Sequence, residues 1–300
     1  MNIQQLNQQH AIDGHLEIVE GPGGLPQIKI NSSGAEALVS LYGAQVLSYK
    51  PREAAQDLLF TSEAAYYQPG KAIKGGIPLC WPWFGYDPLQ QGRPAHGFAR
   101  TRMWKINTGE LLADGDVRLV LGMQVKEDPA LWPHTAEVLL EITVGSRLDI
   151  SLVTKNPGAD TLSLTKALHS YFLVGDINQV EVSGLEDRWY LDKADAWKKK
   201  QQSGAIQFDA EVDRVYLDVL PELLIQDHEF QRRIRIRSRG NKTAVVWNPW
   251  KDIAKQMADL QDADYLRFVC VETTNAADDL VEIAPGGAYR LEVSYLIEDI

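Results

Sequence analysis

The feature that most restricts the fold of this chain is a series of short segments in which apolar and polar residues alternate. The clearest pair is Ala136–Val144 and Arg147–Asn156, which Gly145-Ser146 joins as a two-residue connection typical of a β-hairpin. Because side chains alternate between the two faces of a strand, this period of two predicts half-buried strands. The same pattern recurs at Val117–Lys126, Leu162–Val174, Gln179–Leu185, Leu223–Ile236, Thr243–Trp247, Leu266–Thr273 and Ala288–Ile297.

Helix signals are few. The best is Lys251–Leu260, where Asn248 is placed to cap the helix and Pro249 to occupy its first turn. The lysine-rich run Lys198–Gln202 is interpreted as a solvated loop. There is no internal repeat and no Pro- or Ser-rich linker. The pattern therefore predicts an all-β fold, a large antiparallel β-sandwich with few short helices, as a single domain over residues 1–300.

Composition and missing motifs exclude several classes of function. Forty-one acidic against 30 basic residues give a formal net charge of −11, which argues against nucleic acid as a partner. A local basic pocket could still bind a small anion. The sequence has no dinucleotide fingerprint, Walker loop, HExxH or GxSxG motif. Cys80 and Cys270 form neither a disulfide framework nor a CxxC pair, so we expect no metal and no cofactor.

The first ten residues are polar and glutamine-rich, without the apolar core of a signal peptide. No apolar run has the length that a membrane span needs. We therefore expect a cytoplasmic protein without a membrane partner.

The segment Lys71–Gly85 is dense in glycine and proline, and Trp81, Trp83 and Phe84 place three aromatic rings within four residues. The CH-rich faces of sugar rings pack on such aromatic faces, so one interpretation is a carbohydrate-binding cleft. The other is a hydrophobic loop that closes one end of the sandwich.

A second segment, His96-Gly97-Phe98-Ala99-Arg100, places a histidine and an arginine around a glycine turn. Such a pair could hold an anion, because the guanidinium group binds phosphate oxygens with two parallel hydrogen bonds. An ordinary surface arginine is the alternative.

The third candidate is a pair of segments, Leu164–Phe172 around His169 and Phe268–Thr274 around Glu272. A glutamate within Val-Cys-Val-Glu is costly to bury unless it is paired or functional. A histidine in an apolar strand is more often a satisfied core residue. If both segments are strands, His169 shares a face with Tyr171. Two such anomalies together favour an acid–base site, although the sequence does not show that they meet.

These segments resemble the aldose 1-epimerase (galactose mutarotase-like) superfamily, and within it the hexose-6-phosphate mutarotases, also called glucose-6-phosphate 1-epimerases. The resemblance covers most of the chain from Ala37 to the final strands. Its most specific pieces are Lys74-Gly75-Gly76-Ile77-Pro78, Trp81-Pro82-Trp83-Phe84-Gly85, His96-Gly97-Phe98-Ala99-Arg100, Ala167–Phe172, Asp213-Arg214-Val215-Tyr216, Val246-Trp247-Asn248-Pro249 and Val269-Cys270-Val271-Glu272.

The resemblance implies a super-sandwich of antiparallel sheets with the sugar in a concave cleft. It implies that His169 is the catalytic acid and Glu272 the catalytic base. It places His96, Arg100 and Asp213 at positions that hold the substrate.

Three further positions are relevant: Trp247 and Lys74 belong to the expected substrate-binding set, and Lys74 and Ala95 depart from the family pattern. Trp247 lies in a matching segment, and we expect it to bind substrate. Lys74 falls where the phosphate-preferring branch usually carries arginine, so the charge is kept and the bidentate fork is lost. Ala95 falls where some relatives have glutamine.

The resemblance implies interconversion of the α and β anomers of a hexose 6-phosphate by ring opening and reclosure. Moving two protons requires no cofactor. The alternatives are an epimerase for unphosphorylated aldoses and a non-catalytic carbohydrate-binding protein. Members of the family are often monomeric, so we expect a monomer with a sugar phosphate as its small-molecule partner.

Overall fold

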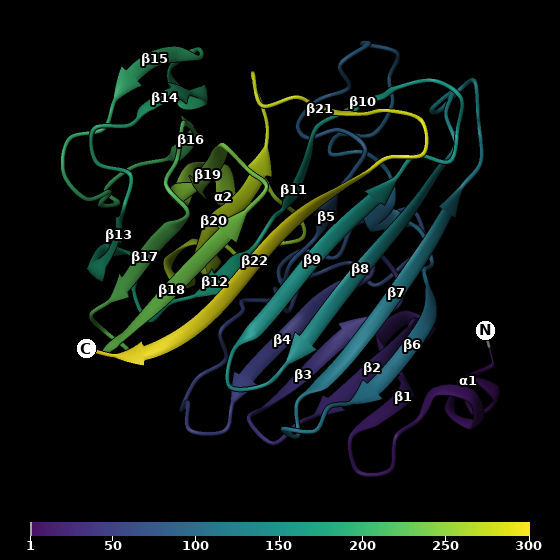
Figure 1. The fold of residues 1–300 in the computed structure, drawn as a ribbon. Coiled ribbons are helices and arrows are strands. Elements are labelled where there is room, and N and C mark those ends of the chain that lie inside the picture. The colour runs from purple at the N-terminus through teal and green to yellow at the C-terminus, as the bar shows by residue number, and fades with distance from the viewer. Residues whose placement is uncertain (1) are drawn as a thin grey trace.

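Antiparallel sheets account for most of the computed structural model, which describes residues 2–300 (Figure 1). We call the largest layer the outer sheet. Its strands, in spatial order, are β13 (Val180–Ser183), β17 (Glu222–Asp227), β18 (Arg232–Arg239), β22 (Ala288–Asp299), β9 (Leu148–Lys155), β8 (Ala136–Val144), β7 (Val117–Val125) and β6 (Lys105–Leu111).

Three smaller groups of strands complete the fold. The site sheet contains β15 (Lys198–Gln201), β14 (Trp189–Asp192), β16 (Val212–Leu217), β19 (Thr243–Asn248), β20 (Phe268–Asn275), β11 (Lys166–Leu168) and β5 (Leu79–Cys80), with β12 (Tyr171–Leu173) also paired to β20. The N-terminal sheet contains β1 (Leu16–Glu20), β2 (Pro26–Asn31), β3 (Ala35–Ser40) and β4 (Gln45–Pro51). The remaining pair is β10 (Leu162–Leu164) with β21 (Val281–Ile283).

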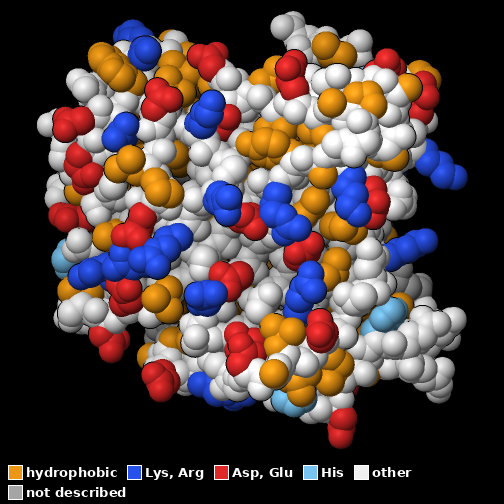
Figure 2. Space-filling model, in the orientation of Figure 1, with side chains coloured by type: hydrophobic (Ala, Val, Ile, Leu, Met, Phe, Trp, Pro, Cys, Tyr) orange, Lys and Arg blue, Asp and Glu red, His pale blue; other side chains and the backbone are white. Residues whose placement is uncertain are grey.

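The outer sheet shows why the alternating pattern is present. Along β8, every second residue is buried and the others are partly exposed. The outward residues form cross-strand ion pairs, such as Arg290 Nη1 to Glu141 Oε2 at 3.0 Å and Arg235 Nε to Glu298 Oε1 at 2.8 Å. Figure 2 shows basic and acidic side chains interspersed over this side of the molecule. One face is therefore solvated and the other faces the core, as expected for an antiparallel sheet.

The core lies between the outer sheet and the other two large sheets. One apolar cluster includes Ile28 of β2, Leu140 of β8 and Val271 of β20. Strand β20 is buried along its whole length, although only its first four residues, Phe268–Val271, are apolar. These sheets confirm the predicted all-β sandwich class.

The helices differ from the prediction. Helix α1 (Ile3–His10) was missed because none of its residues is buried, so its apolar period is weak. Helix α2 is Trp250–Ala254, half the predicted length, since turns closed by three-residue hydrogen bonds follow it. The Asn248 side chain accepts a hydrogen bond from the Trp250 amide at 2.9 Å. Short 3₁₀ helices are η1 (Pro22–Gly24), η2 (Ala99–Thr101), η3 (Ile177–Gln179), η4 (Lys193–Asp195) and η5 (Asp264–Arg267). Within residues 2–300, no helix has the length and apolar character to cross a membrane.

Three strand predictions were wrong in detail. The segment Leu162–Val174 is not one strand but β10, β11 and β12, with breaks at Thr165 and at His169–Ser170. The run Lys198–Gln202, interpreted as a loop, is largely the edge strand β15. Lys198 and Lys200 form ion pairs with carboxylates, and Lys200 Nζ lies 2.7 Å from Asp192 Oδ2. These positive charges therefore do not prevent strand pairing. The segment Leu223–Ile236 is not one strand but parts of β17 and β18, which pair through a short turn.

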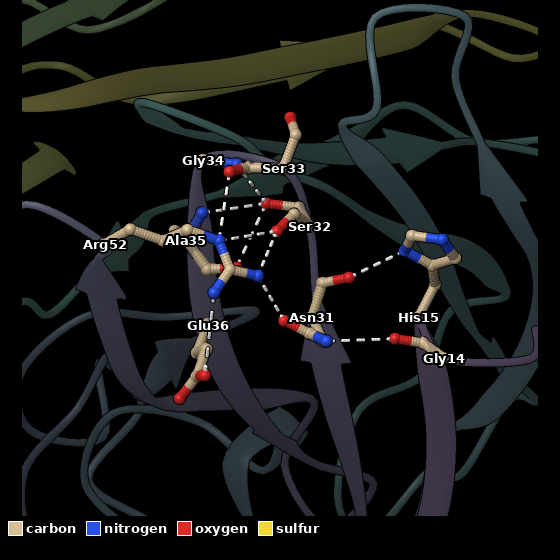
Figure 3. Close-up of polar contacts among 9 residues, drawn as sticks. All are labelled: Gly14, His15, Asn31, Ser32, Ser33, Gly34, Ala35, Glu36 and Arg52. Atoms are coloured by element: carbon tan, nitrogen blue, oxygen red, sulfur yellow. Dashed lines mark hydrogen bonds and ion pairs between the residues drawn. The ribbon is translucent and has the colours of Figure 1, made fainter.

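The N-terminal sheet is tied to its own turns by side-chain hydrogen bonds (Figure 3). Arg52 donates to Asn31 Oδ1 at 2.5 Å and to the Ser32 carbonyl at 2.6 Å. Asn31 in turn donates to the Gly14 carbonyl at 3.0 Å. The β2–β3 turn is thereby fixed to the end of β4. A cavity of about 840 Å³ lies over this sheet, and none of the candidate site residues lines it.

A buried lysine gives a stability prediction. Lys166 of β11 is fully buried, its Nζ lies 4.6 Å from the centroid of the Tyr289 ring, and Nζ has no hydrogen-bond partner. Burial lowers the pKa of Lys166 to about 7. Since the unfolded chain then binds more protons above that pH, stability rises between about pH 7 and the ordinary lysine value near 10.4.

We expect Lys166→Met to raise the free energy of unfolding by about 2–4 kcal/mol at about pH 6, because it removes an unpaired buried charge. The gain should shrink as the pH rises towards about 10, because the folded amine is then neutral and the unfolded amine begins to lose its proton. Urea unfolding at the two pH values measures it, with the exposed Lys105→Met as the matched control. A variant less stable than wild type at about pH 6 would show that the buried ammonium is stabilising.

Candidate active site

The structure brings His169 and Glu272 together on the site sheet. Glu272 lies within β20, and His169 follows β11 directly, one residue beyond the Leu168–Thr273 pair of the two strands. His169 Nε2 lies 3.4 Å from Glu272 Oε1, and the two residues are 8% and 3% exposed. A histidine and a glutamate more than 100 positions apart in sequence therefore form a buried pair on one sheet.

His169 lies in a short break between two strands. Strand β11 ends at Leu168 and β12 begins at Tyr171, so His169 and Ser170 belong to neither strand. The His169 and Tyr171 rings nevertheless stack, with centroids 4.9 Å apart and an interplanar angle of 8°. The sequence pattern predicts that they share one face of a continuous strand, but the structure has two separate strands here, so the contact arises from the break and not from strand alternation. The stacking fixes the plane of the imidazole.

Other predicted residues surround the pair. The Trp247 ring is edge-on to His169 at 6.0 Å, and the His96 ring is edge-on to it at 5.7 Å. Asp213 of β16 is paired in register with Trp247 of β19, which is paired with Cys270 of β20. The neighbouring strands β16 and β19 thus place Asp213 and Trp247 in one row across the sheet beside the pair.

The glycines of the matching motifs are required by close backbone approach. A Cβ on Gly76 would lie 2.2 Å from the Val46 carbonyl oxygen, and one on Gly97 would lie 2.0 Å from that of Trp81. Both residues have positive φ, 58° and 69°. Only glycine combines a positive φ with so close a backbone contact. The packed backbone at Gly76 and Gly97 therefore fixes the position of the neighbouring residues Lys74 and His96.

Three cations act on the buried pair. Lys74 Nζ is 3.5 Å from Asp259 Oδ2, and Lys193 Nζ is 2.6 Å from Asp213 Oδ2. Arg100 differs, because within residues 2–300 it forms no ion pair and donates only to the Ala95 carbonyl, at 3.0 Å. It is therefore the site cation with its charge still available for a ligand.

Burial shifts the pKa values of Glu272 and His169 in opposite directions. Burial raises the pKa of Glu272 well above its usual value, and the Asp213 carboxylate adds to this. Burial lowers the pKa of His169 well below its usual value, and His96, Arg100 and Lys74 add to this. These shifts favour the uncharged form of the pair, in which Glu272 carries the proton and His169 is neutral.

Sequence reasoning missed three contributors, namely Lys193, Asp259 and the stacking role of Tyr171. Lys193 lies in η4, between β14 and β15, and Asp259 lies in the turns after α2. Neither belongs to a motif with chemical character, so no signal in a single sequence could have found them. They reach the site only through the fold.

Comparison with known proteins places the chain among sugar epimerases. The model of the family described as "Aldose 1-epimerase" matches residues 26–296. A protein named "Putative glucose-6-phosphate 1-epimerase" from Cenchrus ciliaris is 37% identical, over 91% of this chain and 85% of that protein. A protein of the same name from Escherichia coli strain K12 is also 37% identical, over 85% of this chain and 84% of that one.

Solved structures agree. The crystal structure of a "putative mutarotase (YeaD)" from Salmonella typhimurium superposes with a TM-score of 0.90 at 33% identity, over 97% of this chain and 96% of that chain. The galactose 1-epimerase of Lactobacillus acidophilus, at 14% identity and a TM-score of 0.70, shares the fold. The match over most of the chain and the sandwich fold lead to one conclusion: this protein belongs to the aldose 1-epimerase family of isomerases.

Proposed function

We propose that this protein interconverts the α and β anomers of a hexose 6-phosphate, with glucose 6-phosphate as the first substrate to test. The observation that carries the proposal is the buried His169–Glu272 pair beside Arg100, a cation without a carboxylate partner. The pair supplies acid–base chemistry, and the free guanidinium supplies a phosphate anchor. The names of the two 37% identical relatives support the same substrate.

The proposed reaction moves two protons and breaks one bond. Glu272, as a carboxylate, takes the proton from the anomeric hydroxyl while imidazolium His169 gives a proton to the ring oxygen. The bond between C1 and the ring oxygen breaks, and the electron pair on the anomeric oxygen forms the carbonyl. Rotation about C1–C2 presents the other face of the aldehyde. Reclosure returns both protons, so the pair ends as it began.

The phosphate has a part in this chemistry as well as in binding. Burial and the nearby cations hold His169 neutral in the empty site. A phosphate dianion at Arg100 would offset those cations and so favour the imidazolium form of His169, which gives its proton to the ring oxygen. Substrate binding and proton placement are coupled in this proposal, which predicts poor turnover of sugars without the phosphate.

One observation favours the unphosphorylated alternative. Two of the three site cations, Lys74 and Lys193, are already paired with Asp259 and Asp213, which reduces the positive charge open to a dianion. The two substrates are separated by kcat/KM for glucose 6-phosphate against glucose and galactose. A preference of at least about 10²-fold for the phosphate ester is expected from charge-assisted hydrogen bonds. A preference for a neutral sugar would show that the substrate is an unphosphorylated aldose, and the proposed acid–base reaction would still apply.

A further inference from the structure

We propose that Cys80 is a positioning residue whose thiol, together with the Gly85 amide, holds His96 as the neutral imidazole with its proton on Nε2. In that form His96 is a fixed hydrogen-bond donor to a sugar oxygen, and it is not a second acid or base. The role towards a sugar rests on the proposed function. The tautomer of His96 is a property of the free protein and can be tested without any substrate.

The tautomer follows from which groups face Nδ1. The Gly85 backbone N–H donates to His96 Nδ1 at 3.4 Å, and a backbone amide cannot accept in return. This contact favours a lone pair on Nδ1, and a neutral ring of that kind has its proton on Nε2. The Cys80 Sγ also lies 3.4 Å from Nδ1. Since Nδ1 is an acceptor, the thiol is the second donor to it.

The surroundings keep both groups in these forms. Cys80, on β5, is completely buried, and burial raises the pKa of its thiol, so the S–H proton is retained. Burial, Arg100 and Lys193 lower the pKa of His96 to about 3, so its imidazole is neutral. The positively charged groups around the site oppose a charged ring, and the two donors select one of the two neutral tautomers.

The backbone holds the His96 ring beside the candidate catalytic pair. His96 has a φ of 65°, in the left-handed region that is costly for a non-glycine residue, and its amide donates to the Gly85 carbonyl at 2.7 Å. Its ring is edge-on to that of His169. Nε2 has no hydrogen-bond partner within residues 2–300 and is not among the buried unpartnered atoms. A donor is thus held open beside the candidate catalytic pair.

The test is nitrogen-15 NMR of the histidine rings in the whole protein, with His96→Asn used to assign the His96 signals. In the wild type we expect an unprotonated Nδ1 and a protonated Nε2. Cys80→Ser keeps an O–H donor and should keep this pattern. Cys80→Ala removes the donor and should shift a measurable fraction of His96 to the other tautomer. Cys270→Ala, at the other buried cysteine, should leave the His96 signals unchanged.

Kinetics give a second readout. Cys80→Ala is expected to lower kcat/KM by about tenfold, mainly through KM, and Cys80→Ser by less than about threefold, since one hydrogen bond is altered. An unchanged tautomer in Cys80→Ala would overturn the proposal, and so would equal losses in the alanine and serine variants. If the tautomers behave as expected and no sugar is turned over, the proposed function fails and the tautomer assignment stands.

Discussion

Replacement of Glu272 by glutamine should lower kcat for anomer exchange by about 10² to 10⁴ without loss of the fold, the range for a positioned acid–base group. Glutamine has the same shape but cannot accept the proton of the anomeric hydroxyl. Glu272 Oε2 is buried without a partner, so the substitution breaks no hydrogen bond there. The surface change Glu137→Gln is the matched control, and Glu272→Gln turnover near that of wild type would remove Glu272 from the reaction.

The same variant has an expected signature in stability. Because burial raises the pKa of Glu272, its contribution to folding is present at low pH and is lost as the pH rises through the folded value. Glutamine carries no such penalty. The stability of Glu272→Gln relative to wild type should therefore be higher at about pH 8.5 than at about pH 5 in urea unfolding. A catalytic residue that costs stability is the pattern expected of a functional site.

His169→Asn should produce a loss of kcat similar to that of Glu272→Gln, because acid and base act in the same step. The double variant should lose little more than either single variant, since groups that act as a unit are not additive. Rates of α–β anomer exchange measured by NMR for the three variants test this. Losses that multiply would show that the two residues act in separate steps.

The second large effect concerns the phosphate. Arg100→Ala should lower kcat/KM for glucose 6-phosphate by about 10²- to 10³-fold and for glucose by less than about threefold, because it removes charge-assisted hydrogen bonds to the phosphate alone. Arg100→Lys should recover part of the loss, since it restores the charge without the bidentate fork.

The control for this experiment is Arg102→Ala. Arg102 is exposed, lies two residues away and packs its guanidinium 5.7 Å from the Phe98 ring centroid. Its loss should affect the two sugars equally and slightly. Equal effects of Arg100→Ala on both sugars would exclude Arg100 from the phosphate site.

Much of the fold could be predicted because strand alternation is a local property. Hairpins such as β8–β9 were visible in the sequence, since each strand has one solvated face. Where burial does not alternate, the prediction failed. Helix α1 buries none of its residues. The edge strand β15 consists of three lysines and a glutamine, and Asp192 and Asp195 form ion pairs with Lys198 and Lys200.

The site was predictable only in part. His169 and Glu272 stood out because each is costly in an apolar strand, but the 3.4 Å contact between them depends on the β11–β20 register. Burial favours the uncharged form of the pair, and burial of this depth is set by the fold. Lys193 and the Cys80–His96 contact depend on long-range packing, which no spacing in the sequence encodes.

The most direct test is exchange NMR at C1 of glucose 6-phosphate, with wild-type protein beside the His169→Asn/Glu272→Gln double variant. Our account predicts that α–β exchange rises in proportion to wild-type protein and stays at the uncatalysed rate with the double variant. Exchange at the uncatalysed rate with wild type, or equal acceleration by both proteins, would contradict the claim that this buried pair opens and recloses the sugar ring.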